Sequence, residues 1–224
     1  MVSGSSVLSE IAAVLEPQGI FVRGVVSFHD GNGPSLSYGS CARTVVLLGN
    51  IGGSIWRSFD HWRTSDQGPD PLDTWSRVAI DRVAGALGAT ALYPSDQPWQ
   101  PFQRWATQAE GLAPSPLGIL IHPRFGLWHG YRGALAFAED LGAAPVESTG
   151  HPCTHCIEKP CLATCPAGAL APTGFAVNPC RSYLDSDGGR ATCMANGCAA
   201  RNACPVGADF RYSAEQLRFH MAAL

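Results

Sequence analysis

The chain has 224 residues, of which 46% are hydrophobic and 15% are charged, and its formal net charge is −3. The apolar fraction is large enough for a packed core, so this composition excludes a wholly disordered chain. The basic residues are 14 arginines and a single lysine without any basic run, and no apolar stretch approaches the roughly 20 residues that span a bilayer. The sequence therefore indicates neither a nucleic-acid partner nor a membrane anchor.

Hydrophobic spacing predicts one helix and two strands in the first 50 residues. Residues 20–28 are rich in β-branched residues, and residues 44–50 form a continuous apolar run bounded by turn residues. Both segments are predicted to be strands. Before them, an amphipathic helix is predicted that places five apolar residues on one face: Val7, Leu8, Ile11, Val14 and Leu15.

Two further helices are predicted from start and stop signals. Asp70 is expected to cap a helix that begins at Pro71, continues with apolar residues at helical spacing and ends at Gly88. A shorter helix with one apolar face is predicted between Pro101 and Gly111.

Strands are predicted over residues 117–121 and 126–137. The resulting order, with paired strands before and after paired helices, favours an α+β fold with a largely antiparallel sheet over a doubly wound parallel sheet. No glycine-rich phosphate-binding loop is present. A shift in composition at residues 142–150 predicts a domain boundary there.

The end of the chain predicts a capped helix. Ser213 and Gln216 have the spacing of a capping box, in which each side chain bonds to the backbone N–H of the other residue. We expect Leu217, Phe219 and Leu224 of this helix to have apolar partners on the N-terminal domain.

Nine cysteines are present, and eight of them lie between Cys153 and Cys204. A disulfide framework would need an export signal, and the N-terminus has neither the basic nor the apolar region of one. We therefore expect a cytoplasmic protein whose clustered cysteines bind metal. Cys41 stands apart from the cluster and is predicted to be a small buried residue.

The first four clustered cysteines closely follow the spacing of a bacterial ferredoxin, in which three cysteines bind one cluster and the fourth, before a proline, binds the other. The last four also end in a Cys-Pro pair, but Arg201 stands where a middle cysteine is expected. The cross-over rule assigns one 4Fe–4S cluster to Cys153, Cys156, Cys161 and Cys204, and a second to Cys165, Cys180, Cys193 and Cys198. The alternatives are a structural zinc site, which usually shows two separate CxxC pairs, and cysteines without metal.

Both Cys-Pro pairs precede a turn of small residues, 167–169 and 206–208. We expect these turns to direct backbone N–H groups at the sulfur atoms of a cluster.

Residues 118–137 combine arginine, histidine and aromatic residues with closely spaced glycines. Glycines let a backbone approach a large ligand, and arginines pair with carboxylate, phosphate or amide oxygens. The alternative is that the arginines are structural and that the tryptophan belongs to the core. The candidate cofactor-binding residues are His122, Arg124, Gly126, Trp128, Arg132 and Gly133.

The stretch IHPRFGLWHGYRGAL resembles the I-H-P-R-F-G-x-W-x-x-x-R-G stretch of cobalamin-processing proteins of the CblC type. Residues 70–87 and 211–216 resemble two further segments of that family. The cysteine module, with PCRSYLD around Cys180, is similar to the module that epoxyqueuosine reductases and reductive dehalogenases join to a CblC-like domain.

The resemblance implies a flavin-reductase-like (nitroreductase-like) domain over residues 1–145 that binds cobalamin or, alternatively, FMN. It also implies a ferredoxin-like module with two 4Fe–4S clusters over residues 146–210 and a helix over residues 211–224 that packs back. The expected function is an iron–sulfur oxidoreductase that passes single electrons to a bound cobalamin, supplied by a reduced flavoprotein or ferredoxin. A ferredoxin-type carrier without a corrinoid and a flavin-linked reductase are the alternatives, and the family also suggests a homodimer.

Overall fold

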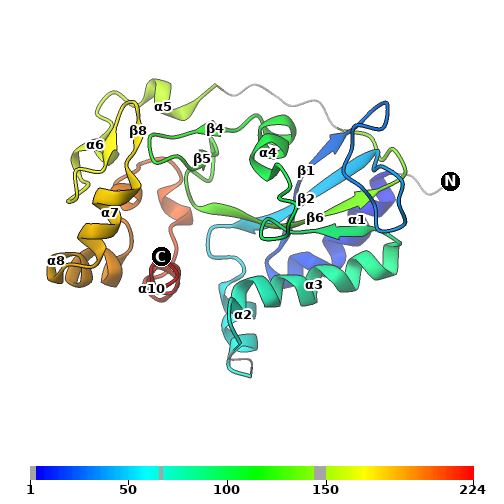
Figure 1. Cartoon of the computed structure of the whole chain (residues 1–224), viewed down its shortest axis with the longest axis horizontal. Helices are drawn as coiled ribbons and strands as arrows, with labels where there is room; N and C mark the ends of the chain where they lie inside the picture. The colour runs from blue at the N-terminus through cyan, green and yellow to red at the C-terminus, as the bar shows by residue number, and fades with distance from the viewer. Residues whose placement is uncertain (1–3, 66–67, 144–149) are drawn as a thin grey trace. The chain divides into compact units, whose positions relative to one another are not determined.

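The computed structural model describes residues 4–65, 68–143 and 150–224 (Figure 1). The chain divides into two compact units. Unit 1 consists of Met1–Gly111 and Gly130–Ser148, and unit 2 consists of Leu112–His129 and Thr149–Leu224. The boundary expected at residues 145 and 146 lies outside the described residues, and residues 112–129 belong to unit 2 rather than to the N-terminal domain.

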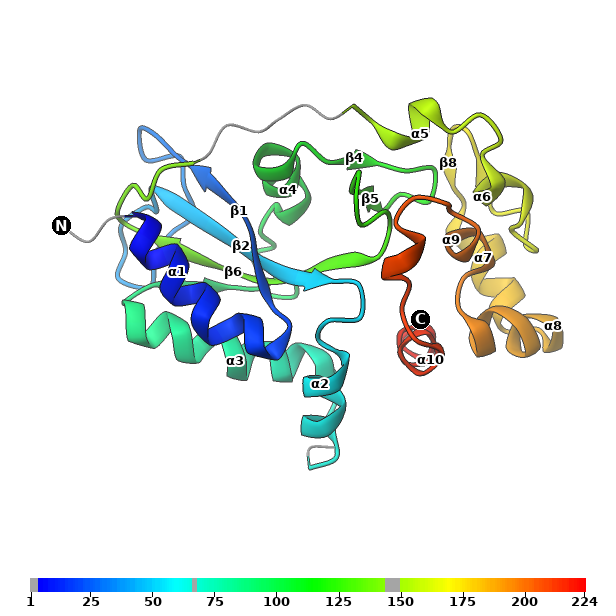
Figure 2. The same ribbon diagram turned by 180° about the vertical axis from the view of Figure 1, so that it is seen from behind.

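Unit 1 is built on a four-stranded sheet with the order β1-β2-β6-β3, in which β1 pairs with β2 and β3 pairs with β6 in antiparallel fashion. Helices α1 and α3 lie together on one face of this sheet and α4 lies on the other (Figures 1 and 2). Its elements are α1 (Gly4–Leu15), β1 (Phe21–Ser27), β2 (Thr44–Ile51), α2 (Trp56–Arg63), α3 (Pro71–Leu87), β3 (Thr90–Leu92), α4 (Phe102–Glu110) and β6 (His129–Phe137).

The core of unit 1 explains why its central strand could be predicted. Helices cover both faces of β2, so Val45, Val46, Leu47 and Leu48 are completely buried and the strand is apolar without alternation. Helices α3 and α4 end where the sequence predicts, each followed by a left-handed glycine. The α+β class and the antiparallel pairings are thus confirmed.

Several local predictions for unit 1 are wrong. Val14 of α1 is 39% exposed, so the buried face of that helix is narrower than expected. Asp70 has a positive φ of 50° and its side chain makes no capping hydrogen bond. Helix α2 and strand β3 were not predicted, because α2 buries a single residue, Phe59, and β3 is only three residues long.

Unit 2 consists of short elements joined by turns. Its predicted strand over residues 117–121 is reduced to two residues that pair with β4. No helix in the described ranges of the chain is both long enough and apolar enough to cross a membrane. The elements are β4 (Ala113–Pro114), β5 (Leu120–Ile121), α5 (Pro152–His155), α6 (Pro160–Ala163), β7 (Leu170–Ala171), β8 (Gly174–Phe175), α7 (Val177–Leu184), α8 (Asp187–Gly189), a π-helix (Arg190–Met194), α9 (Ala199–Asn202), a 3-10 helix (Ala208–Phe210) and α10 (Ala214–Ala222).

Helix α10 is capped as predicted, but it packs differently from the expectation. The Oγ of Ser213 accepts a hydrogen bond from the N–H of Gln216 at 3.2 Å, whereas the Gln216 side chain lies 3.5 Å from a ring nitrogen of His220 and does not complete the capping box. Leu217 packs within unit 2, against Trp128 among others. Leu224 is 64% exposed, so little of its side chain is buried.

Candidate functional site

The structure brings the eight clustered cysteines together as two groups of four. One pocket is lined by Cys153, Cys156, Cys161 and Cys204, which we call the first thiol set. The second thiol set is Cys165, Cys180, Cys193 and Cys198, in which the Cys180 thiol interacts electrostatically with the other three. These memberships are those that the cross-over rule predicts. The capacity of the two sets to bind iron–sulfur clusters depends on the chemistry of their sulfur atoms and of the N–H groups around them.

Short helices position the thiols of both sets. Helix α5 carries Cys153 and ends at Cys156, and α6 carries Cys161. Helix α7 carries Cys180, and the π-helix carries Cys193. Prolines begin α5 and α6, where their missing N–H costs nothing and their fixed φ starts the turn.

Burial raises the pKa of five of these thiols, and neighbouring thiolates add to the effect. In the first set the pKa of Cys153, Cys161 and Cys204 is raised, and in the second set that of Cys180 and Cys198. Four thiolates held together without a cation would repel one another. Binding of iron would relieve this repulsion, because a metal site holds cysteine as thiolate and releases the protons.

Backbone N–H groups oppose the rise in pKa by donating to the sulfur atoms. Val206 donates to Cys204, and Ala200 and Arg201 donate to Cys198. The turn after the second Cys-Pro pair thus directs an N–H group at a sulfur atom, as expected. In the turn after the first pair, the N–H of Gly168 instead donates to the carbonyl oxygen of Cys165 at 3.1 Å.

Two kinds of metal site are considered for these cysteines, a single zinc ion and a 4Fe–4S cluster. Among the described residues, no three His, Cys, Asp or Glu side chains are arranged to hold a single metal ion. A zinc site would place its thiolates about 2.3 Å from one ion. A 4Fe–4S cluster takes one cysteine per iron, so its four ligands surround a larger body. Four thiols in each set, with backbone N–H donors at Cys161, Cys204 and Cys198, match the chemistry of such a cluster.

The turn at residues 122–126 makes a close backbone crossing with the loop after Cys204. A Cβ atom on Gly126, whose φ is +59°, would lie 1.8 Å from the carbonyl oxygen of Val206. Reciprocally, a Cβ atom on Gly207 would lie 2.3 Å from the carbonyl carbon of Phe125. Both glycines are therefore required by this crossing, which fixes the loop that carries Cys204.

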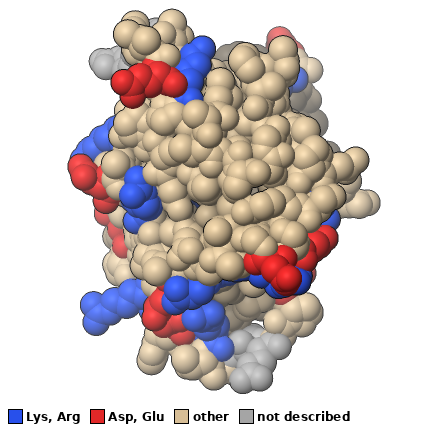
Figure 3. Space-filling model, turned by 90° about the vertical axis from the view of Figure 1, so that its left-hand side faces the viewer, with Lys and Arg blue, Asp and Glu red and all other residues tan. Residues whose placement is uncertain are grey.

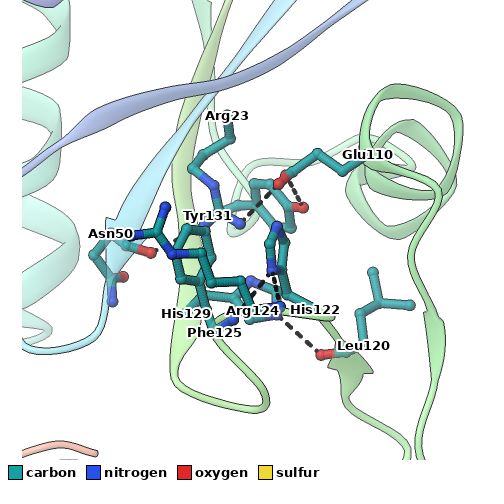
Figure 4. Close-up of polar contacts among 9 residues, drawn as sticks. All are labelled: Arg23, Asn50, Glu110, Leu120, His122, Arg124, Phe125, His129 and Tyr131. Carbon is teal, nitrogen blue, oxygen red and sulfur yellow. Dashed lines mark hydrogen bonds and ion pairs between the residues drawn. The ribbon is translucent and has the colours of Figure 1, made fainter. Parts of the chain in front are cut away.

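His122 shapes the same turn. Its Nδ1 accepts hydrogen bonds from the N–H groups of Arg124 at 3.0 Å and Phe125 at 3.1 Å, and its ring stacks on that of Phe125 with centroids 4.1 Å apart (Figure 4). Because Nδ1 accepts, the proton of the neutral ring resides on Nε2. Nearby, the Nε2 of His129 lies 3.1 Å from the carbonyl oxygen of Leu120. These contacts hold the His122 ring within the turn.

Trp128 belongs to the core of unit 2. It is fully buried and packs edge-on against Tyr212, with ring centroids 5.3 Å apart. The guanidinium of Arg201 lies 4.5 Å from the Trp128 centroid, and its Nη2 donates to the carbonyl oxygen of Leu127 at 2.5 Å. Arg201, at the position where a middle cysteine is expected, thus attaches the cysteine loop to residues 127 and 128 through hydrogen bonding and cation–π contact.

The other two candidate residues, Arg132 and Gly133, lie in unit 1. Arg132 lines a pocket of about 270 Å³ and its Nη1 lies 3.8 Å from a carboxylate oxygen of Asp73. A Cβ atom on Gly133 would lie 2.8 Å from the side chain of Ile80 and 3.1 Å from the ring of Tyr93, so packing explains this glycine. The six candidates are therefore divided, with His122, Arg124, Gly126 and Trp128 in unit 2 and Arg132 and Gly133 in unit 1.

Unit 1 also contains a buried polar network that the sequence did not predict. The guanidinium of Arg23 donates to Glu110 at 2.8 Å and to the carbonyl oxygen of Asn50 at 3.0 Å, and the Tyr131 hydroxyl donates to Glu110 at 2.6 Å (Figure 4). Burial raises the pKa of Glu110, while Arg23 and Tyr131 lower it. The one signal in the sequence is a charged residue, Arg23, within an otherwise apolar strand.

Cys41 does not fit its prediction. It is exposed and forms an isolated β-bridge with Ser35 in the loop before β2. The expectation of burial is wrong because the residue lies in a loop outside the sheet, and its distance along the chain from the other cysteines makes it a useful control.

Comparison with known proteins adds no assignment. No protein-family model matches the chain, and no curated protein matches it. The relation to CblC-type proteins stays a prediction that rests on the motif at residues 121–133.

Proposed function

We propose that unit 2 is an iron–sulfur module that holds two 4Fe–4S clusters, and that the protein is an oxidoreductase that transfers single electrons. The observation that carries this proposal is the grouping of eight cysteines into two sets of four, with the membership that the ferredoxin cross-over requires. Once bound, the clusters would supply one-electron transfer at low potential.

Other residues of unit 2 would bind and orient the clusters and limit the access of water to them. N–H groups at Cys161, Cys198 and Cys204 would stabilise thiolate charge. In the first set, Cys204 packs in an apolar cluster with Ile121 and Leu127, which limits the access of water to its sulfur atom. Low exposure and hydrogen bonding to sulfur are the two means by which a protein adjusts the potential of such a cluster.

The acceptor proposed from the family resemblance is a corrinoid. Two arginines support it. The guanidinium of Arg124 is exposed and lies 5.5 Å from the centroid of Phe125 and 5.8 Å from that of Phe210, and Arg132 lines the pocket of unit 1. Guanidinium groups match the amide and phosphate oxygens of a corrinoid. A ferredoxin-type carrier would lack this acceptor, and a flavin-linked reductase would bind FMN instead.

Anaerobic reconstitution tests the two-cluster proposal. We expect about eight irons and eight acid-labile sulfides per chain, because each complete ligand set holds four irons. Cys153→Ser and Cys180→Ser should each leave about four irons, and together they should leave none. Cys41→Ser is the matched control and should retain all eight. A wild-type protein with four irons, or with zinc alone, would refute the proposal.

The acceptor is tested separately by calorimetry and visible spectra with cobalamin and with FMN. A corrinoid bound at Arg124 of unit 2 should lose one to two decades of affinity in Arg124→Ala, and one bound in the pocket of unit 1 should lose as much in Arg132→Ala, since a charge-assisted hydrogen bond contributes about 1.5–3 kcal/mol. The iron content of both variants should stay at about eight. Binding of FMN but not cobalamin would favour the flavin-linked reductase, and binding of neither would favour the ferredoxin-type carrier.

A further inference from the structure

Lys159 is the only lysine of the chain and lies at the wall of the first thiol set. It precedes Cys161 by two residues and lines the pocket that the four thiols share. Its ammonium charge acts on Cys153 and Cys161, where it opposes the burial that raises their pKa. The side chain is therefore close enough to influence a charge held in that pocket.

The backbone at Lys159 has a strained conformation. The residue has a φ of +41° in the left-handed region and precedes Pro160, the first residue of α6. Glycine adopts this conformation without the steric cost that a side chain brings, and asparagine adopts it more readily than lysine. Asp70, which precedes Pro71 at the start of α3, has the same left-handed conformation, so the chain uses this turn before a helix-starting proline in both places.

Different cations act on thiols of the two sets. Lys159 and Arg211 act on thiols of the first set, whereas Arg181 acts on Cys180 of the second. Charged residues are sparse here, with only seven between residues 151 and 206. Figure 3 shows a broad area of the surface on which no Lys, Arg, Asp or Glu side chain is seen. Lys159 is exposed, so solvent screens part of its charge, and its influence on a charge in the pocket depends on its position at the pocket wall.

We propose that Lys159 raises the reduction potential of the cluster held by the first thiol set above that of the cluster held by the second. This inference rests on the proposed function of unit 2. One-electron reduction adds one negative charge to a cluster, and a cation at the pocket wall stabilises that charge. Lys159 acts through space, and the four cysteines remain the ligands.

A reductive titration of the reconstituted protein, followed by electron paramagnetic resonance, tests this assignment. The wild type should show two midpoint potentials. Lys159→Gln and Lys159→Gly should lower only the higher one, by up to about tenfold in the reduction equilibrium, or about 59 mV for one electron. Lys159→Arg should leave both unchanged. Cys180→Ser, which keeps the first set intact, should retain the higher potential.

Arg190→Gln is the control, because this arginine is exposed and pairs with Asp187 at 2.7 Å. It should alter neither potential. If Lys159→Gln fails to load iron, Lys159→Gly decides the question, since it removes the charge and the backbone strain together. An unchanged higher potential in a Lys159 variant with about eight irons would overturn this inference alone. So would an equal fall in both potentials. A wild type without clusters would overturn the proposed function and this inference with it.

Discussion

Gly126→Ala should disrupt the first thiol set while leaving the second intact. The added Cβ would lie 1.8 Å from the carbonyl oxygen and 2.6 Å from the carbonyl carbon of Val206. Both are backbone atoms, so no side-chain rotation relieves the overlap. Reaching even 3.0 Å requires the two backbones to separate by about 1.2 Å (3.0 − 1.8). Val206 follows Cys204 by two residues, and metal–ligand distances tolerate only about 0.2 Å of change.

Gly118→Ala is the control that distinguishes the effect of this overlap from the effect of backbone strain. Gly118 lies in the same segment of unit 2 and also has a positive φ, +74°, but a Cβ atom there would meet nothing within 4 Å. Both substitutions incur the left-handed penalty of about 1–2 kcal/mol. In a domain of 60–100 residues, each kcal/mol lowers Tm by about 4–8 °C. Gly118→Ala should therefore be less stable than the wild type but retain its full iron content.

Iron and sulfide analysis after anaerobic reconstitution distinguishes the two outcomes. We expect about four irons per chain in Gly126→Ala and about eight in Gly118→Ala. Gly207→Ala should behave like Gly126→Ala, because its Cβ atom would meet Phe125 from the other side of the same crossing. Eight irons and unchanged cluster spectra in Gly126→Ala would refute the argument that this crossing positions Cys204.

Two further predictions concern stability. Arg23→Met should lower the free energy of unfolding at pH 7 by about 3–5 kcal/mol, because it leaves the Glu110 carboxylate buried without its cation. Arg43→Met removes an exposed ion pair and should cost about 0–1 kcal/mol. Burial raises the folded-state pKa of Glu110, so protonation favours the folded state. The Arg23→Met deficit should therefore shrink as the pH falls towards the unfolded value of about 4.3, and a deficit independent of pH would contradict this. Ser213→Ala should cost about 1 kcal/mol in thermal or urea unfolding through loss of the α10 cap. Gln216→Leu should cost less, because the Gln216 side chain completes no capping box and its Oε1 is buried without a hydrogen-bond partner among the described residues.

Features of the fold that depend on local chemistry could be predicted from the sequence. Strand β2 was found because burial on both faces makes it apolar throughout. The ends of α3 and α4 were found because Gly88 and Gly111 adopt the left-handed conformation that ends a helix. The membership of the thiol sets could be predicted from the spacing of the cysteines, which resembles that of a bacterial ferredoxin.

Features that depend on distant contacts could not be predicted. The ion pair of Arg23 joins residues 87 positions apart, and neither residue signals the other. Gly126 was interpreted as a point of ligand approach, whereas the structure shows a crossing with Val206, 80 positions later. The same limitation explains why residues 118–137 were taken as one segment. The packing of residues 112–129 against the cysteine module assigns them to unit 2, and this contact is not visible in the sequence.

A segment from outside the cysteine-rich part of the chain packs against each thiol set and forms a wall beside it. For the first set this wall is residues 112–129, through Ile121 at the pocket and the crossing at Gly126. For the second set it is α10, whose Met221 packs in a cluster with Cys193.

The same helix explains how the long spacing between Cys193 and Cys198 is accommodated. The π-helix that carries Cys193 has more residues per turn than an α-helix, and Gly197, with a φ of +85°, then reverses the chain before Cys198. A Cβ atom on Gly197 would lie 2.9 Å from the side chain of Leu217 in α10. The reversal is thus held by the C-terminal helix. The cysteine spacing in the second set therefore depends on the capped helix α10, because α10 packs against the glycine that reverses the chain.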